Sequence, residues 1–303
     1  MSRSTTQRAT RSVGRRPSGL FAWVATGAVV AIVATLVLVR VFSGVPTSTN
    51  SSVWVATDAK TAAEVDSVPQ SVFDAVGVSA AGSVTAPIAL KGQPALTAKL
   101  ASGASVPEIL YVGAEYCPFC AAQRWATIAA LGRFGYWSGL GNTESSSVDK
   151  YPNTPTFTFL KAKFTSKYLV FRGVELLNNV YDASSNPPYG KLMSLTSTES
   201  AIFAKYDTSN YINMSPNDDG SIPFISMGNE FLTSGASYDP GLLSGLTRTQ
   251  IASNLSAPSD PVTQAIITSA NEQTAALCKL THQQPGNVCS SLGVKAAKRL
   301  MKI

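Results

Sequence analysis

The sequence is poor in charged residues and has a single histidine. Charged side chains make up 14% of the 303 residues and hydrophobic ones 45%, a composition too apolar for a disordered chain. Because His282 is the only histidine, a metal site built from several histidines cannot form.

The excess of positive charge is confined to the N-terminus. The formal net charge is +6, and five arginines without a neighbouring acid fall in the first sixteen residues: Arg3, Arg8, Arg11, Arg15 and Arg16. The rest of the chain is close to neutral and has no basic block interleaved with aromatic residues. This distribution argues against nucleic acid as a partner.

Only one long apolar run occurs, over residues 20–39, and it carries no charge. Twenty residues are enough for a helix to cross a membrane, and arginines are retained on the cytoplasmic side. We therefore predict a cytoplasmic tail over 1–18, a transmembrane helix over 19–42 and an extracytoplasmic body, in a single-pass protein of the cell membrane. A cleaved signal peptide is the alternative, but its apolar region usually spans only ~7–15 residues.

The remaining chain divides by composition. A Ser/Thr-rich stretch over 43–67 predicts a linker, residues 68–258 a domain with a loop-rich insertion over about 174–220, and residues 259–303 a C-terminal helix with a cysteine hairpin packed on it. The predicted fold class is α/β, with a central mixed sheet flanked by helices.

Hydrophobic periodicity predicts the following elements: strands over 106–114, 156–160 and 168–171, the last two joined around residues 165–166; a helix from Cys117 to about Phe134; a helical piece over 197–206; a hairpin of 221–227 and 230–233 around Gly228-Asn229; and helices over 240–255 and 262–280.

Cys117 and Cys120 have the spacing of either a redox pair or half of a zinc site. Their position between an apolar strand and a helix favours the redox pair, because a helix N-terminus stabilises a thiolate at Cys117. Cys120, one turn later, can then attack the resulting mixed disulfide. Pro118 suits the first helical turn. A buried, inert pair or a static disulfide is the alternative.

The segment Ala114-Glu115-Tyr116-Cys117-Pro118-Phe119-Cys120 resembles the active-site segment of the thioredoxin superfamily. More narrowly, the layout resembles membrane-anchored thioredoxin-like proteins with a Glu-Tyr-Cys-Pro-Phe-Cys motif and a C-terminal cysteine pair. The resemblance implies a cis-proline at the start of a later strand, lying against the cysteines, and Ile222-Pro223-Phe224 stands in that place. Pro223 would then line a substrate groove.

One position departs from this pattern. Many thioredoxin-like enzymes keep a buried carboxylate six residues before the first cysteine, and this sequence has Tyr111 there. Water, Glu108 or Glu115 would have to accept the proton of Cys120 instead. Strand alternation predicts that Glu115 is a solvated residue.

Cys278 and Cys289 enclose the end of a helix and a Pro285-Gly286 turn. Outside the cytoplasm we expect a local structural disulfide. A second redox relay that exchanges with Cys117, or a zinc site with His282 as a third ligand, remains open. We expect no cofactor beyond the redox-active cysteines.

The predicted function is a thiol–disulfide oxidoreductase that exchanges disulfides with exported proteins and has an unidentified membrane or soluble electron partner. The compartment favours an oxidase or isomerase. A membrane-anchored reductase, for example toward apocytochrome c, and a non-catalytic thioredoxin-like binding module are the alternatives. No histidine lies between the cysteines as it does in DsbA-like oxidants, so milder stabilisation of the thiolate is expected.

Overall fold

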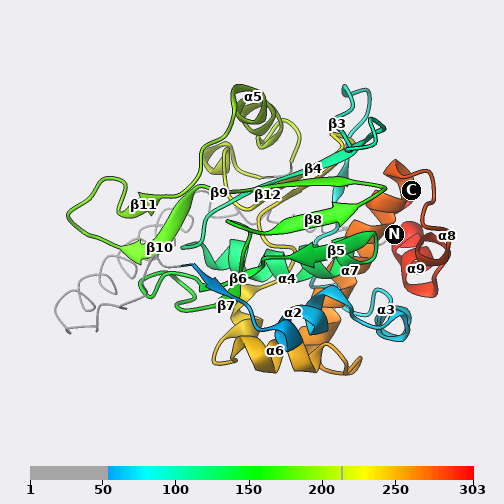
Figure 1. Ribbon diagram of the computed structural model, residues 1–303, viewed down its shortest axis with the longest axis horizontal. Helices are drawn as coiled ribbons and strands as arrows, with labels where there is room; N and C mark the ends of the chain where they lie inside the picture. Colours follow the sequence, from blue (N-terminus) through cyan, green and yellow to red (C-terminus); the bar gives the residue numbers. More distant parts are fainter. Residues whose placement is uncertain (1–53, 213) are drawn as a thin grey trace, which may run out of the picture. The chain divides into compact units, whose positions relative to one another are not determined.

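The computed structural model describes residues 54–212 and 214–303 (Figure 1). The described residues belong to one compact unit, which spans residues 48–303. The predicted basic tail, transmembrane helix and residues 43–53 of the predicted linker lie outside the described residues. In the part of the chain that is described, no helix is long and apolar enough to cross a membrane.

The fold is mixed α/β, and its main element is a six-stranded mixed sheet. The strands are β2 (Ile88–Ala89), β3 (Thr97–Lys99), β4 (Ser105–Gly113), β9 (Val170–Glu175), β12 (Phe224–Met227) and β13 (Phe231–Ser234). Their order is β2-β13-β12-β4-β3, and β9 pairs with β4. The β4–β9 pairing is parallel, whereas the other pairs are antiparallel. The long strand β4 is therefore the centre of the sheet.

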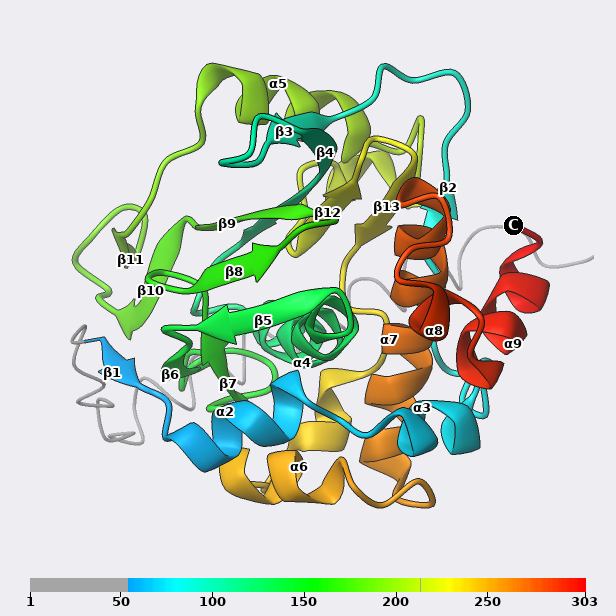
Figure 2. The ribbon, with the colours of Figure 1, turned by 45° about the vertical axis from the view of Figure 1, so that its right-hand side comes forward.

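Side chains alternate along β4 and build two apolar cores. Ile109 and Tyr111 belong to the larger core, and Leu110 and Val112 belong to the smaller one. Helices α4 (Pro118–Gly132) and α7 (Pro261–Leu280) cover the face of the larger core, and α5 (Ser197–Tyr206) covers the other face (Figure 2).

A further layer of helices lies beyond α4 and α7 in Figure 2. It consists of α2 (Ala59–Asp66), α3 (Gln70–Val76) and α6 (Arg248–Asn254), while α8 (Gly286–Cys289) and α9 (Leu292–Met301) follow α7 and pack beside it. As a result, α4 is covered both by the sheet and by helices. All of its side chains from Cys120 to Leu131 are buried.

Smaller antiparallel sheets complete the fold. They are β1 (Val55–Ala56) with β6 (Gly141–Glu144) and β7 (Pro155–Thr158), β5 (Gly135–Ser138) with β8 (Lys163–Ser166), and β10 (Leu177–Tyr181) with β11 (Tyr189–Lys191). Two short 3₁₀ helices are η1 (Pro216–Asp218) and η2 (Pro240–Leu243).

Local sequence explains the main elements. Asp260 caps α7 by accepting a hydrogen bond from the Thr263 amide, and Pro261 opens that helix. The β12–β13 hairpin turns at Gly228 and Asn229, which both have positive φ, as tight hairpin turns require. The predicted strand before Cys117, the helix after it, the hairpin and the helix over 197–206 are thereby confirmed.

Several predictions were wrong, among them the single helix over 240–255, which the structure divides into η2 and α6. The linker prediction fails over α2, because Asp58 caps this helix and Thr61 and Val65 are buried. The insertion cannot begin at residue 174, which lies inside β9. Residues 163–166, predicted as part of a connection, form β8, because the side chains of Phe164 and Ser166 turn inward between the exposed Lys163 and Thr165.

Candidate functional site

Cys117 and Cys120 lie where β4 passes into α4, and both are free thiols. Cys117 is the N-cap residue: its Sγ accepts a hydrogen bond from the Cys120 amide at 3.2 Å, and Pro118 opens the helix. Cys117 retains 5% of its surface exposed, and Cys120 retains none. Of the two cysteines, only Cys117 therefore retains any exposed surface.

The two thiols differ in acidity. The hydrogen bond from the Cys120 thiol lowers the pKa of Cys117 in spite of its burial, and backbone N–H groups and Arg124 lower it further. Burial raises the pKa of Cys120 well above its usual value, and the neighbouring Cys117 raises it further. Cys117 is thus the thiol that ionises first.

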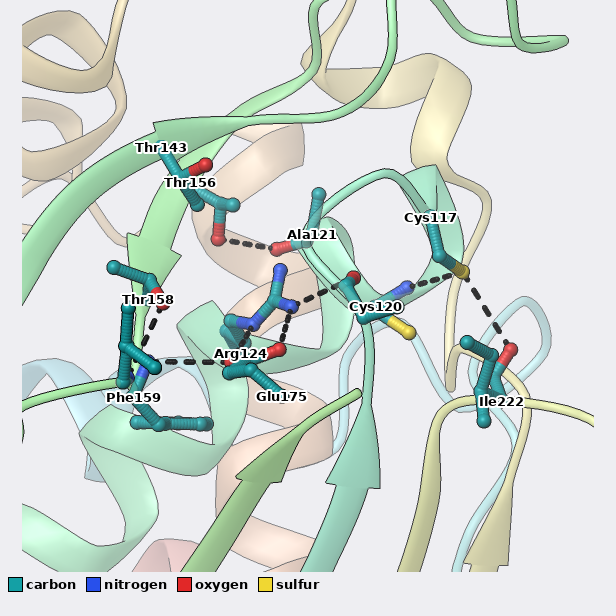
Figure 3. Close-up of polar contacts among 12 residues, drawn as sticks. Cys117, Cys120, Ala121, Arg124, Thr143, Thr156, Thr158, Phe159, Glu175 and Ile222 are labelled. Carbon is teal, nitrogen blue, oxygen red and sulfur yellow. Dashed lines mark hydrogen bonds and ion pairs between the residues drawn. The ribbon is translucent and has the colours of Figure 1, made fainter. Parts of the chain in front are cut away.

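The peptide bond between Ile222 and Pro223 is cis and stands immediately before β12. The Cys117 thiol donates to the Ile222 carbonyl oxygen over 3.6 Å (Figure 3). The two segments meet because β12 pairs antiparallel with β4, so that the start of β12 lies beside the end of β4. The structure thus brings the Ile222-Pro223 segment against the cysteine pair.

Two aromatic clusters include the sequence neighbours Tyr116 and Phe119 of Cys117. The ring of Tyr116 stacks on Tyr189 with centroids 4.4 Å apart, and Tyr189 meets Tyr181 edge-on at 5.7 Å. In the second cluster, Phe119 is 37% exposed and meets Tyr151 edge-on at 6.0 Å. Tyr181 and Tyr189 come from the β10–β11 hairpin, in the segment predicted as an insertion, and sequence reasoning did not select them.

A buried ion pair, also absent from the prediction, lies in the same region. Arg124 of α4 and Glu175 of β9 have no exposed surface, and their side chains form two hydrogen bonds of 2.9 Å and 2.6 Å. Arg124 also donates to the Ala114 carbonyl at 2.8 Å, and Glu175 accepts from the Phe159 amide (Figure 3). The sequence signal was the only charged residue of α4, an arginine four positions after Cys120.

The prediction that Glu115 is solvated was wrong. Its exposure is 8%, and burial raises its pKa despite a hydrogen bond with Thr158. Strand alternation does not apply to it, because β4 ends at Gly113 and the Glu115 amide donates to Leu177 of β10.

The other two residues considered for proton transfer are also placed. Glu108 lies on the face of β4 away from α4, where burial and the nearby Glu199 raise its pKa against the opposing effect of Arg172. Tyr111 is fully buried on the α4 face, and its hydroxyl has no hydrogen-bond partner within the described part of the chain. Burial raises its pKa well above the usual value, so Tyr111 stays neutral.

Cys278 and Cys289 form a disulfide with Cα atoms 5.5 Å apart, as predicted. It lies at the end of α7, where Leu280 faces Gly228. Gly228 follows β12 and Pro223 precedes it, so the two cysteine pairs lie at opposite ends of the sheet. This placement favours a structural disulfide over a relay that exchanges directly with Cys117. Among residues 54–212 and 214–303, no group of three His, Cys, Asp or Glu side chains is placed to hold a metal ion.

The chain was compared with known proteins. A family model described as a domain of unknown function, DUF929, matches residues 96–279, more than half of the chain. This range includes β4, α4, both cysteines of the site and Pro223. No curated protein and no solved structure matches the sequence. The chain therefore belongs to the DUF929 family.

Proposed function

We propose that this protein is a thioredoxin-like thiol–disulfide oxidoreductase that works outside the cytoplasm and exchanges disulfides with exported proteins. The observation that carries the proposal is the inequality of the two thiols. Cys117 has a lowered pKa and some exposure, whereas Cys120 has a raised pKa and none. Disulfide exchange needs this combination of an attacking thiolate and a protected resolving thiol.

The surroundings of the pair support the proposal. Strand β4 leads into the helix that carries the cysteines, and a cis-proline heads the antiparallel strand beside β4. These are the features implied by the resemblance of the Cys-Pro-Phe-Cys segment to thioredoxins. The aromatic rings of Tyr116, Tyr189 and Phe119 offer apolar contacts to a polypeptide that approaches Cys117.

The exchange has two steps. In the reducing direction, the Cys117 thiolate attacks one sulfur of a substrate disulfide and forms a mixed disulfide, and the other substrate sulfur leaves as a thiolate. Cys120 then loses its proton and attacks the Cys117 Sγ, which closes the Cys117–Cys120 disulfide and releases the second substrate thiolate. Two electrons pass from the dithiol to the substrate. In the oxidising direction the same bonds form and break in reverse, and an electron partner must reoxidise the pair.

We favour net oxidation or isomerisation, because the proposed location beyond a membrane anchor over 20–39 is an oxidising one. The reduction potential of the Cys117/Cys120 pair in a glutathione buffer measures the direction. A value near ~−120 mV indicates an oxidase and one near ~−270 mV a reductase.

Trapping tests the proposal. Cys120→Ser removes the resolving thiol, so mixed disulfides between Cys117 and exported proteins should accumulate in cells and disappear on reduction. The matched control, Cys117→Ser/Cys120→Ser, should trap none. If the folded Cys120→Ser protein accumulates no such adducts, the proposed exchange is refuted and a binding role without thiol chemistry takes its place.

A further inference from the structure

The buried ion pair of Arg124 and Glu175 has no part in the two exchange steps described above. Burying two charges costs several kcal/mol per ion, and apolar residues of similar volume often serve stability as well or better. The position of this pair is therefore informative. Arg124 follows Cys120 by four residues on α4, so both side chains lie on the same face of the helix.

Many thioredoxin-like enzymes bury an acid on the strand before the cysteines, whereas this chain buries a cation, Arg124, on α4. Tyr111, the residue in the place of that acid, has its ring 5.8 Å from the Arg124 guanidinium carbon. Its hydroxyl is so close to Gly113 that a side chain there would collide with it, which places the hydroxyl toward the cysteine end of β4. Tyr111 is neutral, and thus contributes no charge to compete with the guanidinium.

The guanidinium is held rigidly but is not fully satisfied. Its Nε and Nη2 bind Glu175 and the Ala114 carbonyl, while Nη1 is buried without a hydrogen-bond partner in the part of the chain that the structure describes. Ala114 is also the residue whose carbonyl accepts from the Cys117 amide, at 3.4 Å. One carbonyl therefore links Arg124 to the loop that carries the nucleophile.

We propose that Arg124, held by Glu175, is a positioning residue that stabilises the thiolates of Cys117 and Cys120 through its charge and makes the pair more oxidising. This inference rests on the proposed exchange function and adds to it the group that sets its redox poise. In the reduced protein the cation favours the Cys117 thiolate. During resolution it favours loss of the Cys120 proton without a neighbouring base.

The pKa shifts agree with this role. The hydrogen bond from the Cys120 thiol, burial and the Cys120 backbone amide have the largest effects on the pKa of Cys117, and the Arg124 charge lowers this pKa further. The same charge lowers the pKa of Cys120 against the dominant effect of burial. A stabilised thiolate favours the reduced form, and a pair whose reduced form is stabilised is the stronger oxidant.

Two variants of the full chain test the inference. Arg124→Met/Glu175→Leu removes both charges at similar volume, which avoids leaving an unpaired buried charge. Glu175→Gln keeps the arginine and removes only the opposing charge. Two quantities are measured: the pH profile of Cys117 alkylation by iodoacetamide, and the equilibrium constant for oxidation of the pair by glutathione disulfide.

The two variants should change these quantities in opposite directions. In the double variant we expect the pKa of Cys117 to rise by about one unit, equivalent to about tenfold less thiolate near neutral pH. The equilibrium constant for oxidation should rise about tenfold, or about 30 mV toward a more reducing potential. In Glu175→Gln both quantities should fall. Loss of packing alone has no reason to produce opposite signs.

The matched control is Arg172→Met/Glu199→Leu, which removes the ion pair on the other face of the sheet. It should leave both quantities unchanged. Unchanged values in the folded double variant, or shifts of the same sign in both test variants, overturn the inference. If the double variant does not fold, the direction of the two shifts in Glu175→Gln decides the test: both quantities must fall for the inference to hold. Neither measurement uses a protein substrate. This inference can therefore fail while trapping by Cys120→Ser succeeds, and it can hold while trapping fails.

Discussion

Glu272 provides a quantitative test of the packing of α7. It lies within this helix with no exposed surface, and neither carboxylate oxygen has a hydrogen-bond partner among the residues described. Burial raises its pKa from 4.5 to about 7. At ~1.4 kcal/mol per pKa unit, this shift corresponds to about 3 kcal/mol of free energy of unfolding.

The direction of the pH dependence follows from the number of protons bound by the folded and the unfolded state. Below pH 4.5 the carboxyl is protonated in both the folded and the unfolded chain, and it adds no pH dependence. From pH 4.5 to about 7 the unfolded chain releases the proton and the folded chain keeps it. The unfolded state then binds fewer protons, so the free energy of unfolding falls as the pH rises. The loss is complete once the pH exceeds the pKa of the folded state.

The assay is urea unfolding of the wild type and of Glu272→Gln from pH 4.5 to 8.5, followed by tryptophan fluorescence. From the lower to the upper end of this range, the free energy of unfolding of Glu272→Gln should rise by about 3 kcal/mol relative to that of the wild type. Asp207→Asn is the matched control, because burial raises the pKa of Asp207 only to about 6; its relative gain should be complete at a lower pH. A difference between Glu272→Gln and wild type that stays constant across the range would refute the reasoning.

Three further predictions concern the cysteines and their surroundings. Iodoacetamide at pH 7 should alkylate Cys117 in the reduced native protein and reach Cys120 only after unfolding, because Cys120 is buried with a raised pKa; peptide mass spectrometry that finds Cys120 modified first would contradict the assignment of the nucleophile. Tyr189→Ala removes the ring stacked on Tyr116 and should lower kcat/KM for a disulfide-bonded protein by up to roughly tenfold while leaving exchange with glutathione unchanged; equal losses with both substrates would argue against a contact with the polypeptide. Cys278→Ala/Cys289→Ala opens a disulfide between residues 11 apart and should lower the free energy of unfolding in urea by about 3 kcal/mol, with no change in the potential of the Cys117/Cys120 pair.

The sequence predicted the elements around the cysteines because their signals are local. Apolar periodicity changes from that of a strand to that of a helix at Cys117, and the structure has β4 before it and α4 after it. Gly228-Asn229 between two apolar runs predicted the β12–β13 hairpin. The same local reading missed α2, whose segment contains only two buried side chains, Thr61 and Val65, and so shows little helical periodicity.

The charges of the site were not predictable from local pattern. A charged residue in a helix is normally expected on a solvent-facing side, but α4 is covered on both sides and offers none from Cys120 to Leu131. Arg124 must therefore find its partner inside the protein, and that partner, Glu175, is 51 residues away in the sequence. Glu175 ends a strand whose pairing with β4 no local pattern specifies. The sequence does show a charged residue where burial is expected: Arg124 is the only charged residue of α4, and most of its neighbours in the helix are small or apolar. Such a conflict between local polarity and burial is the expected mark of a functional position, and it is the reason for assigning the redox poise of the Cys117/Cys120 pair to Arg124.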